Sequence, residues 1–107
     1  SEMRMIFNDD KRSLVIETPG GKKVTIDEDA DKIEIEDEHS NKITMDSNGI
    51  VIDSSKDLTL KAAQNLKLEA PNISNKAQSS FKAEAQGQAQ LTASGDVTVK
   101  GAFVRIN

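Results

Sequence analysis

The chain has 107 residues, enough for one domain, and 30% of them are charged while only 36% are hydrophobic. The net charge of -4 argues against a nucleic-acid-binding protein, because phosphate recognition needs clustered cations. Cysteine is absent, which excludes disulfides and cysteine metal sites, and no apolar run is long enough for a transmembrane helix.

The N-terminal segment predicts a β-hairpin. MRMIF and RSLVIET are apolar runs on either side of the polar sequence NDDK, and residues 8–10 are the expected turn. We expect residues 1–12 to be a linker strand that joins preceding domains, and residues 13–107 to form a single domain.

Pairs of apolar residues two positions apart continue along the chain after the hairpin. The links between the first pairs are TPGGKK, DEDADK and DEHSNK, which predict sizeable surface loops. Alternation with a period of two indicates strands with one buried face. The core residues expected in this part are Leu14, Ile16, Val24, Ile26, Ile33, Ile35, Ile43 and Met45.

From Ile50 onward the apolar pairs recur about every eight residues, with polar residues between them. Each unit has a small residue at its fifth position, which predicts a crowded corner where the chain turns. The sign of the charge at the fourth position mostly alternates, as in Asp53, Lys61 and Glu69, so stacked units would place opposite charges side by side. The core residues expected here are Ile50, Ile52, Leu58, Leu60, Leu66, Leu68, Ile73, Phe81, Leu91, Val97 and Val99.

Residues 76–93 allow a second interpretation. Their composition is rich in helix formers, so propensity alone predicts a helix. Gly87 interrupts that helix, however, and Phe81, Ala89 and Val97 keep the eight-residue spacing. We therefore expect strands with a thin interior.

Short strands that bury two side chains each become stable only by stacking. One chain could wind as a triangular solenoid with three units per turn, or three chains could wind around a common axis. The spacing of the apolar pairs does not decide between these arrangements. No polar cap closes the C-terminus, since residues 97–106 are among the most apolar of the repeat, so this end is expected to meet a partner.

Four features of the sequence together resemble a known family. They are TPGG at residues 18–21, the run NKITMDSNGI at residues 41–50, the eight-residue units from Ile50 onward, which we call octads, and the ending GAFVRIN. This family is the C-terminal needle of phage tail-spike proteins and of the VgrG-like spikes of type VI secretion and related contractile injection systems. The resemblance implies an all-β fold, an intertwined homotrimeric triple-stranded β-helix in the form of a prism, over residues 13–107. The oligonucleotide/oligosaccharide-binding fold and base domains of a full spike would precede it.

The resemblance also implies a function and partners. The needle would pierce the target cell envelope mechanically when a sheath contracts, as part of a phage virion tail or a secreted, extracellular injection apparatus. Its C-terminal end would dock a PAAR-repeat tip protein, through the residues Phe103, Val104, Ile106 and Asn107. We expect no cofactor.

The sequence gives little support for a specific metal-binding or catalytic site. His39 is the single histidine and lies in an acidic link, where a solvent-facing side chain is expected rather than a metal ligand. The acidic links lack the spacing of a calcium loop, and no catalytic constellation is present, so we expect no enzyme. The alternative function is a β-solenoid adhesin or carbohydrate-binding fibre, which the scarcity of aromatic residues disfavours.

Overall fold

The computed structural model describes residues 2–107, and the chain divides into two units after Leu66, each of which is considered by itself. All the strands of the described residues lie in the first unit, and none of these residues is helical. The strands are β1 (Arg4–Asn8), β2 (Ser13–Glu17), β3 (Lys23–Asp27), β4 (Lys32–Glu36), β5 (Lys42–Asp46) and β6 (Gly49–Asp53). The expected all-β class is therefore confirmed.

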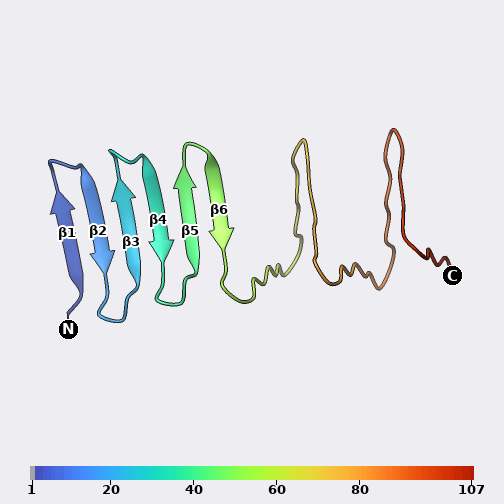
Figure 1. Ribbon diagram of the computed structural model, residues 1–107, viewed down its shortest axis with the longest axis horizontal. Coiled ribbons are helices and arrows are strands. Elements are labelled where there is room, and N and C mark those ends of the chain that lie inside the picture. Colours follow the sequence, from blue (N-terminus) through green and yellow to red (C-terminus); the bar gives the residue numbers. More distant parts are fainter. Residues whose placement is uncertain (1) are drawn as a thin grey trace. The chain divides into compact units, whose positions relative to one another are not determined.

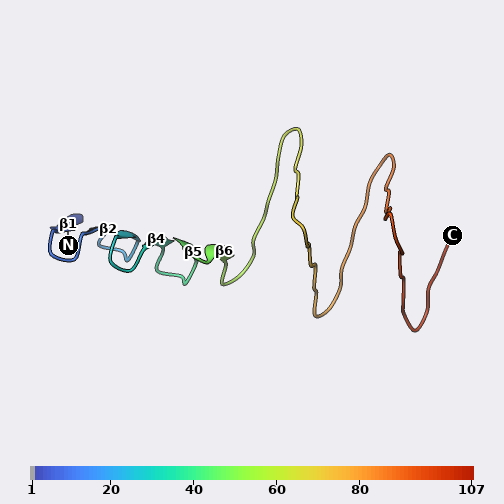
Figure 2. The same ribbon diagram turned by 90° about the horizontal axis from the view of Figure 1, so that it is seen from above.

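The six strands form one antiparallel sheet in which each strand pairs with the next along the chain (Figures 1 and 2). Every strand has five residues, with apolar residues at its second and fourth positions. Gly21, in the link between β2 and β3, has a φ of 105°, and a Cβ there would lie 3.1 Å from the Glu38 Cβ. This turn therefore requires glycine.

The predicted N-terminal hairpin is confirmed, with a shift of its turn. β1 pairs with β2 so that Phe7 lies opposite Leu14, and the strand continues through Asn8. The turn occupies residues 9–12, where the Asn8 side chain accepts a hydrogen bond of 3.0 Å from the Lys11 amide. The turn thus begins one residue later than the polar sequence suggested.

The intertwining expected over residues 13–107 is wrong for the six-stranded part. Interwound chains need strands of other chains between successive strands of their own, but each of β2–β5 already has both edges hydrogen-bonded to neighbours in the same chain. Links of two to five residues return the chain directly along the neighbouring strand, which makes the antiparallel meander the natural outcome.

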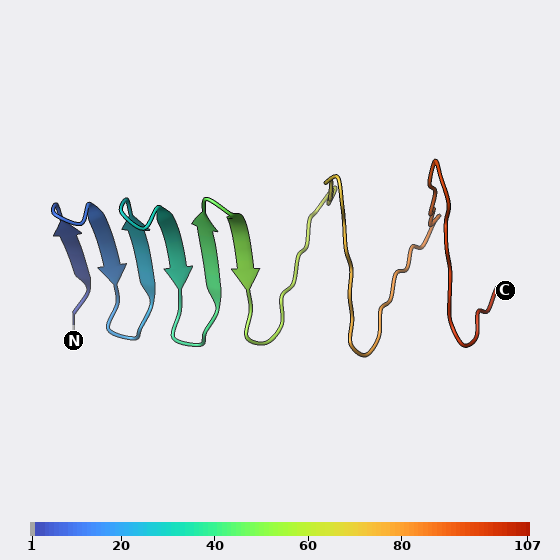
Figure 3. The same ribbon diagram turned by 45° about the horizontal axis from the view of Figure 1, so that its top comes forward.

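Residues 54–107 form neither helix nor paired strand (Figure 3). The helical alternative for residues 76–93 is therefore wrong, and the strands expected in the octads are not formed within the chain. The single-chain solenoid is wrong as well, because it requires a strand ladder between units of one chain. The backbone bends directly after each small fifth-position residue, namely after Ser54, Ala62, Ala70, Ala77, Ala85, Ala93 and Gly101.

Candidate functional site

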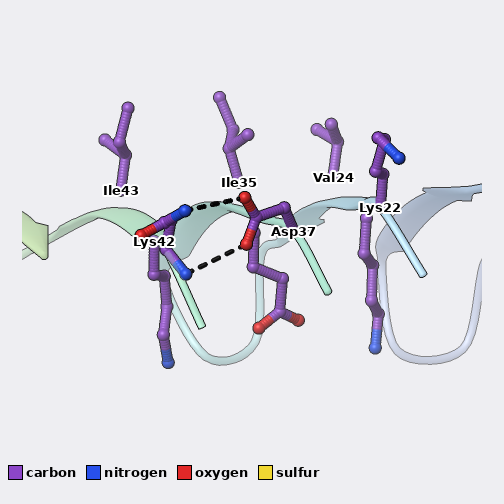
Figure 4. Close-up of a pocket in the computed structure, with 9 residues that line it drawn as sticks. Lys22, Val24, Ile35, Asp37, Lys42 and Ile43 are labelled. Carbon is purple, nitrogen blue, oxygen red and sulfur yellow. Dashed lines mark hydrogen bonds between the residues drawn. The ribbon is translucent and has the colours of Figure 1, made fainter. Parts of the chain in front are cut away.

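One face of the sheet carries only apolar side chains, which come from the second and fourth residues of each strand. Strand register aligns the second and fourth residues of the six strands into two continuous rows. Figure 4 shows Val24, Ile35 and Ile43 of one row projecting to the same side of the sheet. The first row is Met5, Ile16, Val24, Ile35, Ile43 and Ile52, and the second is Phe7, Leu14, Ile26, Ile33, Met45 and Ile50. We call these twelve residues the apolar face.

The apolar face has no cover within the chain. None of the described residues is buried, and Ile26 and Ile35, in the middle of the sheet, remain 45% and 43% exposed. A one-layer sheet cannot form a core, because a stable domain packs at least two layers against each other. Covering the exposed part of one such side chain would gain on the order of 1 kcal/mol. The face is therefore built to be covered by another surface.

The opposite face carries charges of alternating sign. At one end of the strands, cross-strand neighbours follow the order Arg4, Glu17, Lys23, Glu36, Lys42 and Asp53. In the middle of this face, the Glu34 side chain is only 15% exposed and lies 3.8 Å from the Lys32 ammonium and 3.7 Å from that of Lys42. Opposite charges on neighbouring strands support this register and identify the face turned toward water.

Side chains connect the links at each end of the sheet. The Arg12 guanidinium donates to the Asp29 carboxylate at 2.9 Å, which raises the pKa of Arg12, and this contact joins the β1–β2 and β3–β4 links. At the other end, the Lys22 ammonium donates to the Glu38 carboxylate at 2.9 Å and joins the β2–β3 and β4–β5 links. Each contact thus connects two successive links that lie at the same end of the sheet.

The β4–β5 link is organised around Asp37. Its carboxylate accepts hydrogen bonds from the Asn41 side chain at 2.9 Å and from the Asn41 and His39 amides at 3.0 and 2.8 Å. Figure 4 shows two hydrogen bonds to the Asp37 carboxylate as dashed lines. The bonds from Asn41 lower the pKa of Asp37. Asn41 in turn accepts from the Ser55 amide at 2.8 Å, and the Ser55 hydroxyl donates to the His39 carbonyl at 2.7 Å. The link thereby holds the corner that follows β6.

Replacing Lys22 with methionine is expected to raise the pKa of Glu38. The hydrogen bond from Lys22 is the main cause that lowers this pKa in the folded protein. Because this pKa is lowered, the Lys22–Glu38 contact stabilises the fold at pH values above the pKa of Glu38 in the unfolded chain. This stabilisation is lost as pH falls through the pKa of Glu38 in the folded protein. A carboxyl ¹³C NMR titration measures the change. Asp37 is the internal control, because its hydrogen bonds come from Asn41 and His39 and not from Lys22. An unchanged pKa of Glu38 would show that Lys22 is not the main cause.

The structure gathers the predicted core residues of the first pairs onto one surface. All eight from Leu14 to Met45, together with Ile50 and Ile52, lie on the apolar face. Sequence reasoning missed Met5 and Phe7, although their spacing of two within the predicted hairpin was a sufficient signal. The Asp37–Asn41–Ser55 network was missed as well, and the Asp and Asn of the sequence DEHSN were its signal.

The remaining predicted residues lie along segments without a partner. The core residues expected from Leu58 to Val99 are exposed, as are the predicted docking residues, with Phe103 at 90% and Ile106 at 91%. The His39 side chain is 72% exposed and lies 3.4 Å from the Glu38 carboxylate, so its expected solvent-facing position is confirmed. Within residues 2–107 no group of acidic or histidine side chains is arranged to hold a metal ion, and no helix could cross a bilayer.

A family model described as the phage baseplate V C-terminal trimerisation domain matches residues 13–107. The chain belongs to this family. The resemblance to a spike C-terminal needle is thereby confirmed, and an uncovered apolar face is what a trimerisation domain requires before assembly. No curated protein matches the chain.

Membership of the baseplate V trimerisation family indicates a general structural role. It supports a homotrimer, a structural part in the spike of a phage baseplate, and a place in the virion tail. The family description names no catalytic activity. A surface of twelve apolar side chains, opposite a face that carries paired charges, is suited to association with another protein surface.

Proposed function

We propose that three copies of the chain pack their apolar faces around a common axis and form the shaft of a membrane-piercing spike. The observation that carries this proposal is the continuous, uncovered apolar face of β1–β6 in a chain of a trimerisation family. Two further copies would supply the missing second layer, while the charged faces would point outward. In this arrangement the core residues from Leu14 to Ile52 form the interior of a three-sided prism.

The octads would complete the shaft. Their apolar pairs, from Leu58 to Val99, find no partner in the chain, and the backbone bends after each small residue. Three chains that turn at these corners would each supply one side of every layer and bury the pairs on the axis. Chains interlocked in this way separate only when many layers break together, which gives the kinetic stability that a piercing device needs.

The C-terminal end would dock a small conical protein of the PAAR-repeat class. Phe103 and Ile106 are the most exposed large apolar residues of the described chain. Together with Val104 and Asn107 they would form the blunt end of the trimer. The shaft would transmit the force of a contracting sheath to this tip and then to the target envelope, in a phage tail or in a type VI-like secretion system. It would have no enzymatic activity.

The mass of the protein in solution tests the assembly. We expect light scattering to give three times the chain mass of 11.6 kDa, independent of dilution. Unheated samples are also expected to run as trimers on SDS gels, because interlocked chains unfold slowly. Boiled samples of the same protein are the control and should run as single chains. A monomer in light scattering would overturn the proposed function.

A further inference from the structure

One unit of the repeat carries a polar residue where the other units carry an apolar one. The backbone bends three residues after the second member of each apolar pair, as it does after Leu60, Leu68 and Val99. The same spacing separates Asn75 from the bend that begins at Gln78. Asn75 therefore occupies, by sequence phase and by backbone geometry, the position that Leu68 occupies in the preceding unit.

The amide of Asn75 needs hydrogen-bond partners when the chains assemble. At the first and third positions of the units from Ile50 to Ile106, every residue except Asn75 is apolar. In the proposed shaft these positions face the common axis, so three Asn75 side chains meet in one layer. A carboxamide left alone among apolar side chains is unfavourable. Three carboxamides at the same height satisfy one another, because each can donate to the next and accept from the previous one.

The apolar residues of the repeat do not fix how three chains align along the axis. A chain displaced by one octad would still place apolar side chains against apolar side chains. The apolar face of β1–β6 tolerates the same displacement, because its two rows run without interruption from strand to strand. One polar position in an otherwise apolar interface supplies the missing information, as a single buried asparagine does in coiled coils.

We propose that Asn75 determines the register of the three chains by forming hydrogen bonds with the Asn75 side chains of the other two copies. This inference rests on the proposed trimer and identifies the residue that selects one of its possible alignments. A chain displaced by one octad would place its Asn75 beside Leu68 or Ala83 of the other copies and leave the amide without a partner. The aligned trimer satisfies all three amides. Asn75 thus lowers stability relative to leucine and gains a unique alignment.

Co-expression of two versions of the chain tests the register. The shifted variant combines Leu68→Asn with Asn75→Leu, which moves the asparagine by one unit and keeps the composition. It is co-expressed with the unchanged chain carrying a mass tag, and native mass spectrometry counts the mixed trimers. We expect them about tenfold below their statistical proportion, because a buried amide without a partner costs about that factor in an equilibrium constant. Displacing one chain to realign the amides would leave apolar layers uncovered at both ends.

The matched control exchanges two residues that alternation turns away from the axis, Lys67→Ser with Ser74→Lys, and is expected to mix with the unchanged chain in statistical proportion. If the shifted variant is a trimer by light scattering and mixes statistically, Asn75 does not determine the register, while the proposed function stands. Monomers of the unchanged chain would overturn the trimer as well. Should the shifted variant not assemble alone, Asn75→Leu takes its place. Its trimers are expected to resist higher denaturant concentrations and to mix below the statistical proportion, and statistical mixing would again contradict the proposal.

Discussion

Replacing Ile26 with lysine is expected to convert the trimer into monomers. Ile26 lies on β3 in the apolar face, between Leu14 and Ile33 of the neighbouring strands. In a single chain this substitution costs little, since the side chain is 45% exposed and an ammonium there reaches water. Inside a closed trimer, three ammonium groups would lose water without a partner, at a cost of several kcal/mol each. Light scattering measures the change in mass.

The matched control is Thr25→Lys, on the adjacent position of the same strand and on the opposite face. Thr25 lies opposite Glu34, so a lysine at this position meets an opposite charge. The trimer is expected to persist in this variant. If Ile26→Lys remained a trimer, the apolar face would not be the surface that the copies share. Equal loss in both variants would show a general effect on the sheet rather than on the interface.

The sequence predicts the strands well where alternation is strong. Each of β2–β5 carries the expected apolar pair, and charged residues stand at both ends of β3, β4 and β5. Alternation also defines which side chains share a face, because a shift of one residue would turn a whole strand over. The prediction of Met5 and Phe7 needed one step more, namely to extend the hairpin register from Leu14 and Ile16 onto β1.

The pairing partners could not be predicted from alternation, because parallel and antiparallel strands share the same period of two. The distinction lies in the links. Asp37 and Asn41 form a compact turn that returns the chain along β4, and Gly21 permits the turn before β3. Beyond Asp53 the sequence still alternates, but in the structure no neighbouring strand completes the hydrogen bonds. A strand needs a partner, and alternation does not identify the chain that supplies it.

Replacing Val104 and Ile106 together with aspartate is expected to abolish binding of a PAAR-repeat tip protein. Both residues lie in the last segment, with exposed fractions of 52% and 91%, and they alternate as a strand pair does. In the proposed trimer these positions present six apolar side chains at the blunt end. Six carboxylates would repel one another and would lose water without a partner in the contact. Binding is measured by calorimetry, and we expect at least a hundredfold weaker association.

Arg105→Asp is the matched control, because Arg105 lies between the two positions and alternation turns it to the other side. This variant carries a new carboxylate at the same end but is expected to keep the tip protein bound. Light scattering on each variant must first show a trimer, and the single variant Ile106→Asp serves if the double variant separates the chains. Undiminished binding in an intact trimer of the Val104 and Ile106 variant would exclude docking through this end. Comparison of Arg105→Asp with the double variant of Val104 and Ile106 thus distinguishes general electrostatic repulsion from the loss of a specific apolar contact.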